Sequence, residues 1–271
     1  MEDKKITIIG AGSTGLSTAY FLSKMGEENV RILEKDFVGS GATGRCGTGI
    51  RAQFADKPTI KIMKESKKLW KQWSNEMDFN FLQTGYLYLH HSEEEVERFK
   101  KMHRLQNSLG VPSRVIDTDE IQEICKHINT SDITAGSFNP KDGKAHPFKV
   151  VLELKKFIEN TEIELNEYTE VKDIKINKNG EEKKIITDTD EYNTEIIVNA
   201  TGGWASKIGE MMNIKIPIEP HRHQAIITEP FKKKTIEPMI VSMKHEGAYF
   251  TQTERGGIVG GVSKPENEPP T

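Results

Sequence analysis

The chain has 271 residues, of which 35% are hydrophobic and 29% are charged, a composition typical of a globular protein with a sizeable core. Its 38 Lys and Arg residues nearly balance its 41 Asp and Glu residues, and the net charge of -3 argues against binding to nucleic acid or to an anionic membrane surface. No apolar run reaches the roughly 20 residues that a membrane-spanning helix needs. We therefore expect a soluble protein with no transmembrane segment and no nucleic-acid partner.

The N-terminus and the cysteines indicate a cytoplasmic location. The opening sequence MEDKKITIIG is charged and leads directly into a predicted strand, without the apolar region or the cleavage site of a secretory signal. Cys46 and Cys125 are the only cysteines, and their spacing fits neither a redox dithiol nor a zinc site. We expect both to be reduced thiols, and we expect no metal site.

The N-terminal segment carries a pattern typical of dinucleotide binding. An apolar run at residues 6–9 predicts a buried parallel strand, and the sequence GAGSTG that follows predicts a turn into a helix. Gly10 allows the tight turn, Gly12 allows the backbone to approach a pyrophosphate, and Gly15 allows the helix to pack closely on the sheet. The next predicted strand ends at Glu34, whose carboxylate can accept both hydroxyls of an adenosine ribose and would repel the 2′-phosphate of NADP. The alternative is that these glycines only pack a helix on a sheet.

A second glycine-rich segment, GSGATGRCGTG, begins five residues after Glu34. Bare backbone at this place is suited to line the pyrophosphate, the ribityl chain and the isoalloxazine ring of a flavin. An NAD-dependent enzyme would leave residues 39–49 without an assignment. A flexible surface loop is the alternative that the composition leaves open.

The middle of the chain predicts a second layer of structure. A helix starts at Asp56 and carries an apolar face, and the sequence FLQTGYLYLHH predicts a strand with a turn at residues 84–85. The sequence SEEE at residues 92–95 is typical of a capping box, and it predicts a helix that ends at Gly110. A shorter helix is predicted at residues 119–128.

The remaining part of the chain is predicted to add a strand to the first sheet and then to form a second sheet. The sequence PFKVVLELKKFIEN predicts an amphipathic helix, and strands are predicted near residues 163–176 and 183–189. An apolar strand from Ile196 then rejoins the nucleotide-binding sheet. From Ile214 onward, the sequences HQAIITEP, AYFTQT and GGIVGG predict a mainly antiparallel layer.

Four motifs, IIGAGSTG, EKDFVGSGATGRCGTGIRAQF, QTGYLYL and IIVNATGGWA, resemble the D-amino-acid-oxidase-type (DAO) FAD-dependent oxidoreductases. The resemblance runs through the whole chain and is strongest to the branch that contains the beta subunits of archaeal L-proline dehydrogenase and of heterotetrameric sarcosine oxidase. It implies noncovalent FAD and the oxidation of a small secondary amino acid, such as proline or sarcosine, by hydride transfer to flavin N5. It also implies an α/β fold, in which a Rossmann-like FAD-binding domain of the glutathione-reductase type is interleaved with an α+β substrate domain that has a mainly antiparallel sheet.

The resemblance also implies a domain plan. Residues 1–81 and 140–213 would form the FAD-binding domain, and residues 82–139 and 214–271 would form the substrate-binding domain. Members of the family continue beyond the point that corresponds to residue 271. The resemblance therefore implies a fragment, a subunit that a partner completes, or a noncatalytic subunit that binds FAD or a related nucleotide.

Carried onto this sequence, the family pattern places FAD contacts in four groups of residues. The contacts to the AMP half would be Gly10, Gly12, Gly15, Glu34 and Lys35. The residues along the pyrophosphate would be Ser40, Gly41, Ala42 and Thr43. Those beneath or beside the flavin ring would be Arg45, Cys46, Gly47 and Thr48. A second contact segment would be Ala200, Thr201 and Gly202, and we interpret the adjacent Trp204 as a packing residue.

Three side chains are candidates for handling the substrate. A guanidinium can bind a carboxylate with two parallel hydrogen bonds, so Arg51 is the first candidate for the carboxylate anchor and Arg45 is the second. The alternative for either arginine is an acidic side chain or an FAD phosphate as its partner. The resemblance places Tyr249 against the substrate.

Three histidines are further candidates for a cofactor or metal site. His146 lies near the position at which some relatives attach FMN covalently, so the resemblance implies FMN as a further cofactor at a subunit interface, together with a partner subunit. We expect His146 itself to lie at the surface or at an interface. His221 and His223 would share one face of a strand, but a metal pair there would lack a third ligand.

Overall fold

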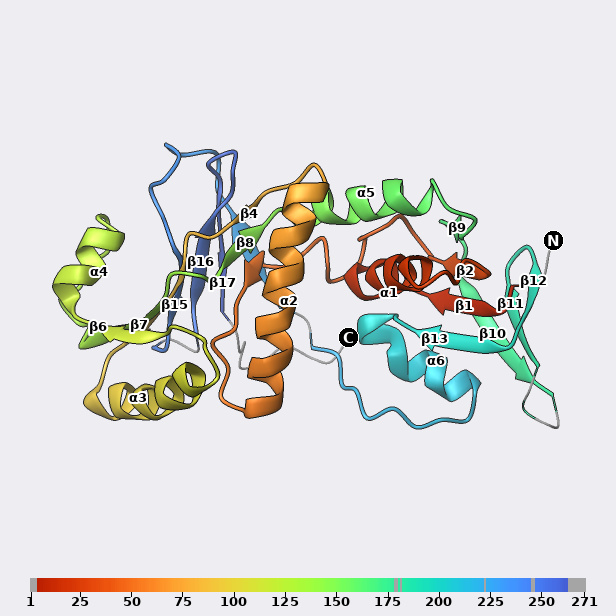
Figure 1. Cartoon of the computed structure of the whole chain (residues 1–271), viewed down its shortest axis with the longest axis horizontal. Helices are drawn as coiled ribbons and strands as arrows, with labels where there is room; N and C mark the ends of the chain where they lie inside the picture. The colour runs from red at the N-terminus through yellow and green to blue at the C-terminus, as the bar shows by residue number, and fades with distance from the viewer. Residues whose placement is uncertain (1–3, 178–179, 181, 222, 245–246, 263–271) are drawn as a thin grey trace. The chain divides into compact units, whose positions relative to one another are not determined.

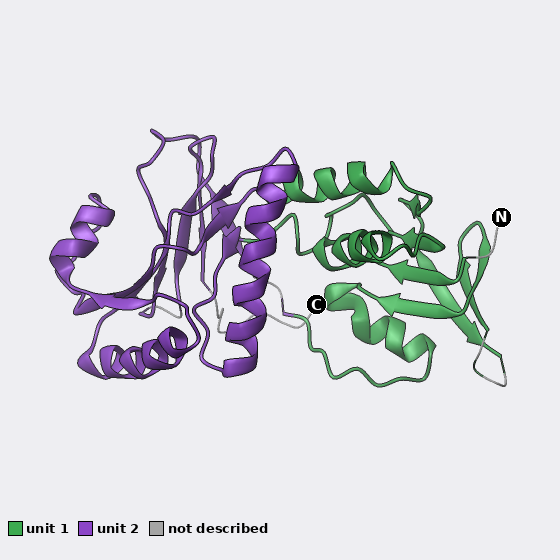
Figure 2. Cartoon of the chain, in the orientation of Figure 1, with its two compact units in different colours: residues 1–46, 147–220, 270–271 green, residues 47–146, 221–269 purple. Residues whose placement is uncertain are grey.

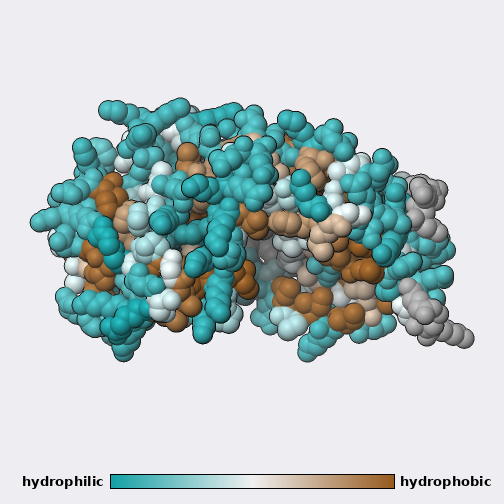
Figure 3. All heavy atoms as spheres, in the orientation of Figure 1, coloured by the Kyte–Doolittle hydropathy of each residue, from teal (hydrophilic) through white to brown (hydrophobic). Residues whose placement is uncertain are grey.

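The computed structural model describes residues 4–177, 180, 182–221, 223–244 and 247–262 (Figure 1). Two compact units divide these residues (Figure 2). Of the described residues, unit 1 contains 4–46 and Pro147–Pro220, and unit 2 contains Gly47–His146 and those between 221 and 262. On the face drawn in Figure 3, groups of hydrophobic residues are separated by hydrophilic ones. None of the described helices combines the length and the apolar character that crossing a membrane requires.

A four-stranded parallel sheet forms the centre of unit 1. Its strands, in spatial order, are β13 (Ile196–Asn199), β1 (Ile6–Ile9), β2 (Val30–Leu33) and β9 (Glu164–Asn166). All residues of β1 and β2 are buried, because a parallel sheet of this kind is covered on both faces. The predicted return of the chain to this sheet at Ile196 is confirmed.

Helices cover this sheet. They are α1 (Ser13–Lys24), α5 (Pro147–Ile158) and α6 (Ala205–Met211). Helices α1 and α5 pack together, with the ring centroids of Tyr20 and Phe157 4.6 Å apart. Ile208 of α6 packs in a core cluster with Ile9 and Leu33 of the sheet. This arrangement brings the start of α1 to the carboxyl end of the sheet.

A separate antiparallel sheet in unit 1 contains β10 (Val171–Ile176), β11 (Lys183–Thr187) and β12 (Glu191–Thr194). The single strand predicted near residues 163–176 is therefore wrong, since β9 and β10 belong to different sheets. The chain changes direction between them at Tyr168, whose φ of 56° is left-handed and incompatible with a continuous strand. Strand β12 was not predicted, because its sequence EYNT is polar.

A seven-stranded sheet forms the centre of unit 2. Its strands, in spatial order, are β14 (Ala225–Ile227), β17 (Ile258–Gly261), β16 (Tyr249–Gln252), β15 (Met239–Ser242), β5 (Tyr86–His90), β7 (Ala135–Asn139) and β6 (Arg114–Ile116). Strands β15 and β5 pair in parallel, and the other five pairs are antiparallel. The predicted fold, a parallel α/β part interleaved with a mainly antiparallel layer, is confirmed.

A small sheet and three helices complete unit 2. The sheet has the order β3 (Gly49–Ile50), β8 (Gly143–Ala145) and β4 (Phe81–Leu82), and the helices are α2 (Lys57–Glu76), α3 (Glu93–Ser108) and α4 (Thr118–Ile124). The predicted capping box is confirmed, because Ser92 Oγ accepts a hydrogen bond from the Glu95 N–H at 3.3 Å. Helix α4 ends four residues before the predicted boundary at residue 128.

The boundaries of the two units differ from the predicted domain boundaries. We predicted that residues 1–81 and 140–213 form one domain, whereas residues 47–81 and 140–146 lie in unit 2. The reason is that β3 and β4 both pair with β8, and α2 contacts α3. Residues 214–220 lie in unit 1 instead of the second domain, since Ile216 packs against Gly209 of α6. Which unit binds FAD and which binds substrate stays a prediction.

Candidate functional site

A cavity of about 300 Å³ lies in unit 1, where the carboxyl ends of β1, β2 and β13 meet. Ligands of open parallel sheets bind at this edge. The structure brings most of the predicted cofactor contacts together around the cavity. The predicted residues that line it are Gly10, Gly12, Glu34, Lys35, Ser40, Gly41, Ala42, Thr43, Ala200, Thr201 and Gly202.

The glycines of the first turn are required by close backbone contacts. Gly10 has a φ of 103°, and a Cβ atom there would lie 2.6 Å from the carbonyl oxygen of Ala200. A Cβ atom on Gly15 would lie 1.9 Å from the carbonyl oxygen of Gly10. Gly12 is the N-cap residue of α1, and the Ser13 N–H donates a hydrogen bond to Thr43 Oγ1 at 3.0 Å. An anion at this end of the cavity would therefore meet the positive end of the helix dipole beside the Thr43 hydroxyl. Contact with a phosphate stays a prediction.

Glu34 lies at the end of β2 with its carboxylate fixed in place. The residue is 8% exposed, and its Oε2 accepts a hydrogen bond from the Ala11 N–H at 2.7 Å. Its Oε1 accepts hydrogen bonds from the Asp36 N–H at 3.0 Å and from Ser40 Oγ at 3.4 Å. These hydrogen bonds hold the Glu34 side chain in a fixed position at the cavity. Its predicted contact with a ribose stays a prediction.

The second glycine-rich segment serves two purposes. Ser40, Gly41, Ala42 and Thr43 line the cavity, but Gly39 and Gly44 face helix α5. A Cβ atom on Gly39 would lie 2.9 Å from Cγ2 of Val151, and one on Gly44 would lie 2.4 Å from Cζ of Phe148. Sequence analysis missed this packing, although Phe148 and Val151 belong to the apolar part of the predicted helix.

Trp204 lines the cavity and is 39% exposed, so our interpretation of it as a core packing residue is wrong. The ammonium nitrogen of Lys35 lies 3.7 Å from the centroid of its ring, a distance typical of a cation–π interaction. The nearest atom to a Cβ placed on Gly41 is Cζ3 of this ring, at 3.7 Å. Trp204 and Lys35 together therefore form one wall of the cavity.

Arg45 and Cys46 do not line this cavity. Both are exposed residues of unit 1, and the thiol of Cys46 is free. Gly47 and Thr48 belong to unit 2. A Cβ atom on Gly47 would lie 3.0 Å from Cε2 of Tyr249, so this glycine makes room for the tyrosine ring. Their predicted contact with the flavin ring stays a prediction.

In unit 2, Arg51 lies among aromatic rings. Its Cζ atom is 4.1 Å from the ring centroid of Phe54 and 5.7 Å from those of Tyr86 and Tyr88. Its Nη1 donates a hydrogen bond to the backbone oxygen of Gln53 at 2.6 Å. Within the described part of the chain, no carboxylate forms an ion pair with Arg51. The alternative of an internal acidic partner therefore finds no support.

Tyr249 lies in the same unit and shares neighbours with Arg51. It packs against a buried cluster that contains Tyr86, Tyr88 and Met239. Gly49 also makes room in this region, since a Cβ atom there would lie 2.5 Å from Sδ of Met239 and 2.9 Å from Cε2 of Tyr86. The structure thus brings Arg51 and Tyr249 together around Tyr86.

A buried acid that the sequence did not indicate supports this region. Asp142 is fully buried, and its Oδ1 accepts hydrogen bonds from Lys67 Nζ at 2.5 Å and from the Ala52 N–H at 3.0 Å. Burial raises the pKa of the Asp142 carboxyl. Because Ala52 directly follows Arg51, its hydrogen bond to Asp142 fixes the backbone beside the arginine. The dipeptide Asp-Gly at residues 142–143 resembles an ordinary turn, so the sequence carried little signal for this role.

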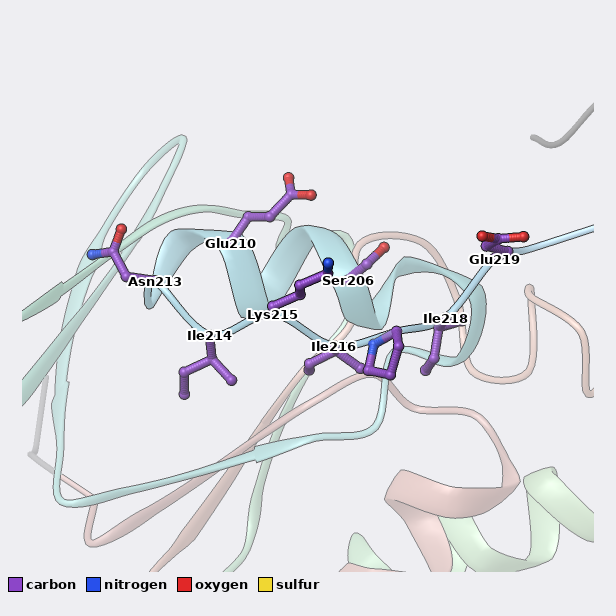
Figure 4. A pocket seen from close by; sticks show the side chains of 9 residues that line it. Ser206, Glu210, Asn213, Ile214, Lys215, Ile216, Ile218 and Glu219 are labelled. Carbon is purple, nitrogen blue, oxygen red and sulfur yellow. The ribbon is translucent and has the colours of Figure 1, made fainter.

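The other candidates are not brought into these sites. His221 and His223 are exposed, and His146 is partly buried. The described residues contain no cluster of three or more His, Cys, Asp or Glu side chains suited to a metal ion. A larger hollow of about 830 Å³ in unit 1 is formed by α6 and the segment that runs along it (Figure 4). None of the predicted site residues lines this hollow.

Comparison with known proteins identifies the family. The model of the FAD dependent oxidoreductase (DAO) family matches residues 5–271. The chain belongs to this family. The predicted family is therefore confirmed, and with it FAD as the cofactor. The crystal structure of L-proline dehydrogenase from P. horikoshii is similar to all of this chain, with 45% sequence identity and a TM-score of 0.93, and the match covers 73% of that chain.

Curated relatives are longer than this chain. The sarcosine oxidase subunit beta of Arthrobacter sp. is 28% identical over 280 residues, which cover 96% of this chain and 66% of that protein. The mitochondrial dimethylglycine dehydrogenase of Rattus norvegicus is 30% identical over 261 residues, which cover 94% of this chain and 30% of that protein. The chain thus spans about two thirds of the first relative and less than a third of the second.

Proposed function

We propose that this chain binds FAD and takes part in the oxidation of a small secondary amino acid, such as proline or sarcosine. The observation that carries the proposal is Arg51, a partly buried cation that has no carboxylate partner among the described residues of a DAO-family chain. A guanidinium in this state is suited to bind the carboxylate of a ligand. The names of the similar proteins, L-proline dehydrogenase and sarcosine oxidase, support the substrate class.

The residues around the cavity of unit 1 fit the ADP part of FAD. Glu34 would accept the ribose hydroxyls, and the backbone at Gly12 and residues 40–43 would face the pyrophosphate. Residues 200–202 would provide the second contact. Bound FAD would supply the hydride acceptor, flavin N5.

The residues of unit 2 would orient the substrate. Arg51 would hold the carboxylate, and Tyr249 would contact the same molecule. Burial raises the pKa of Tyr86 and of Tyr88 above the ordinary value, so their hydroxyls stay neutral at physiological pH. Because these two hydroxyls carry no charge, Arg51 would be the group that binds the substrate carboxylate. An uncharged, partly buried surface also favours the uncharged form of the substrate amine, which is the form that can release hydride.

We also propose that the chain works with a partner subunit. The relatives from Arthrobacter and Rhodobacter capsulatus are each named as a beta subunit, which supports a hetero-oligomer. Both cysteines are free thiols, and the proposal keeps the cytoplasmic location inferred from the sequence. FMN at a subunit interface near His146 stays a prediction.

A noncatalytic FAD-binding subunit is the second candidate. It is favoured by one observation, namely that the cavity is lined by residues of unit 1 alone and does not need Arg51 or Tyr249. To separate the two, we would purify the chain, record its flavin absorbance and add proline or sarcosine without oxygen. Bleaching supports the enzyme. Colour without bleaching would favour the noncatalytic subunit, and no colour after the addition of FAD would refute both.

A further inference from the structure

We propose that Phe54 is a positioning residue, which holds the guanidinium of Arg51 in the orientation that binds a carboxylate. This inference rests on the proposed function and assigns a role to the last residue of the motif EKDFVGSGATGRCGTGIRAQF, to which the resemblance gave none. The Phe54 ring is the nearest aromatic neighbour of the guanidinium, at 4.1 Å, whereas Tyr86 and Tyr88 are each 5.7 Å away.

Contact with the Phe54 ring holds the guanidinium without using a hydrogen-bond acceptor. A guanidinium carries five N–H groups in one plane, and a cation that lies over an aromatic ring is attracted by the charge distribution of the ring and not by an oxygen acceptor. The backbone oxygen of Gln53 accepts one hydrogen bond from Nη1. The other donors form no ion pair with the described residues, so an edge of the guanidinium stays available for the two oxygens of a carboxylate.

The segment that carries Phe54 is anchored at three successive residues. The Ala52 N–H donates to Asp142 Oδ1 at 3.0 Å, and Gln53 Nε2 donates to the Tyr86 carbonyl at 3.0 Å. Gln106 Nε2 of helix α3 donates to the Phe54 carbonyl at 2.9 Å. These bonds fix the backbone from which the ring projects.

The ring itself packs against a buried cluster. Phe54 contacts the group formed by Ala52, Ile60 and Val111, whose members are at most 1% exposed. Because this core cluster holds Phe54 in place, its ring offers Arg51 a fixed surface. An arginine on such a surface loses less conformational freedom when it binds its ligand, and the affinity for that ligand rises.

The test is a double-mutant cycle between Phe54 and Arg51. The ligand is pyrrole-2-carboxylate, a planar aromatic analogue of proline whose ring cannot be dehydrogenated to an imine and which therefore reports binding without turnover. Its dissociation constant is measured by calorimetry on the full chain with FAD added. We expect Phe54→Leu to weaken binding by about threefold to tenfold and Phe54→Tyr, which keeps the ring, to bind like the wild type.

In the background of Arg51→Met, which itself weakens binding by about tenfold or more, Phe54→Leu is expected to have no further effect. Val111→Ala is the matched control, because it loosens the same core cluster without touching Arg51, and it should leave the dissociation constant unchanged. If Phe54→Leu does not fold, Phe54→Met replaces it, since a flexible apolar chain fills the same space without a flat face.

Equal weakening by Phe54→Leu with and without Arg51 would overturn the positioning role, as would equal weakening by Phe54→Leu and Val111→Ala. If Arg51→Met binds as well as the wild type, or if the wild type does not bind, the proposed function fails as well. The two failures are therefore distinguishable.

Discussion

Two buried histidines of unit 2 are expected to make the protein less stable in mild acid. His90 and His103 are 0% and 5% exposed. Their rings pack around Phe99, with centroids 4.2 Å and 6.4 Å from its ring. Burial is the main cause that lowers the pKa of each imidazole to about 4, and for His90 the neighbouring charges of His103, Arg98 and His91 contribute further.

The sign of the effect follows from these values. Near pH 5 the folded protein keeps both imidazoles neutral, whereas in the unfolded chain they have an ordinary pKa of 6.5 and are protonated. The unfolded state therefore binds more protons, and stability falls as the pH falls through 6.5. Between pH 7 and pH 5, the loss is about 2 kcal/mol for each histidine and about 4 kcal/mol for the pair. This is a large fraction of the roughly 5–15 kcal/mol by which most domains are stable.

The assay is urea unfolding at pH 7, 6 and 5 of the wild type, of His103→Leu and of the control His127→Gln. Nε2 of His103 forms no hydrogen bond with the described residues, so leucine removes the titration without breaking a bond at that atom. His103→Leu is expected to lose about 2 kcal/mol less than the wild type between pH 7 and pH 5. The control changes an exposed histidine and should behave like the wild type. The same pH dependence in all three proteins would refute the reasoning.

Three further predictions concern the two units. Gly15→Ala is expected to abolish retention of FAD during purification, because the added Cβ would lie 1.9 Å from the Gly10 carbonyl oxygen; a variant that keeps its flavin would contradict the close packing. Lys67→Met is expected to lower stability by about 3–5 kcal/mol in denaturant unfolding, since it leaves the buried carboxylate of Asp142 without its cation, and Lys68→Met, which changes an exposed pair, is the control. Trp204→Phe is expected to remove most of the fluorescence quenching that ADP causes on binding, because Trp204 lines the cavity; quenching of undiminished size would exclude Trp204 from the nucleotide site.

The nucleotide-binding part was predictable because its signals are local. Gly10, Gly12, Gly15 and Glu34 lie within one strand–helix–strand segment, and each of their roles follows from a short-range rule. The same is true of the capping box at residues 92–95, in which the Glu95 carboxylate also accepts a hydrogen bond from the His91 N–H at 2.7 Å. These patterns can be recognised in short stretches of sequence, although the close approach of Gly10 to the Ala200 carbonyl oxygen cannot.

What the sequence did not reveal depends on contacts between distant residues. Gly39 and Gly44 leave no room for a side chain, because Val151 and Phe148, more than a hundred residues later in the chain, contact them closely. The aromatic surroundings of Arg51 come from β5 and from Phe54, and their approach depends on how the strands of unit 2 pair. The unit boundary at Cys46 follows from the pairing of β3 with β8, which no local pattern shows.

The central claim is that Arg51 anchors the carboxylate of a substrate whose oxidation reduces the flavin. The most direct test follows the anaerobic bleaching of bound flavin at increasing concentrations of proline and sarcosine, in the wild type and in Arg51→Met. We expect one of these substrates to bleach the wild type, and we expect Arg51→Met to need an about 10-fold to 100-fold higher concentration for half-maximal bleaching. Bleaching of both proteins at the same concentration, or a flavin-loaded wild type that neither substrate bleaches, would contradict the claim.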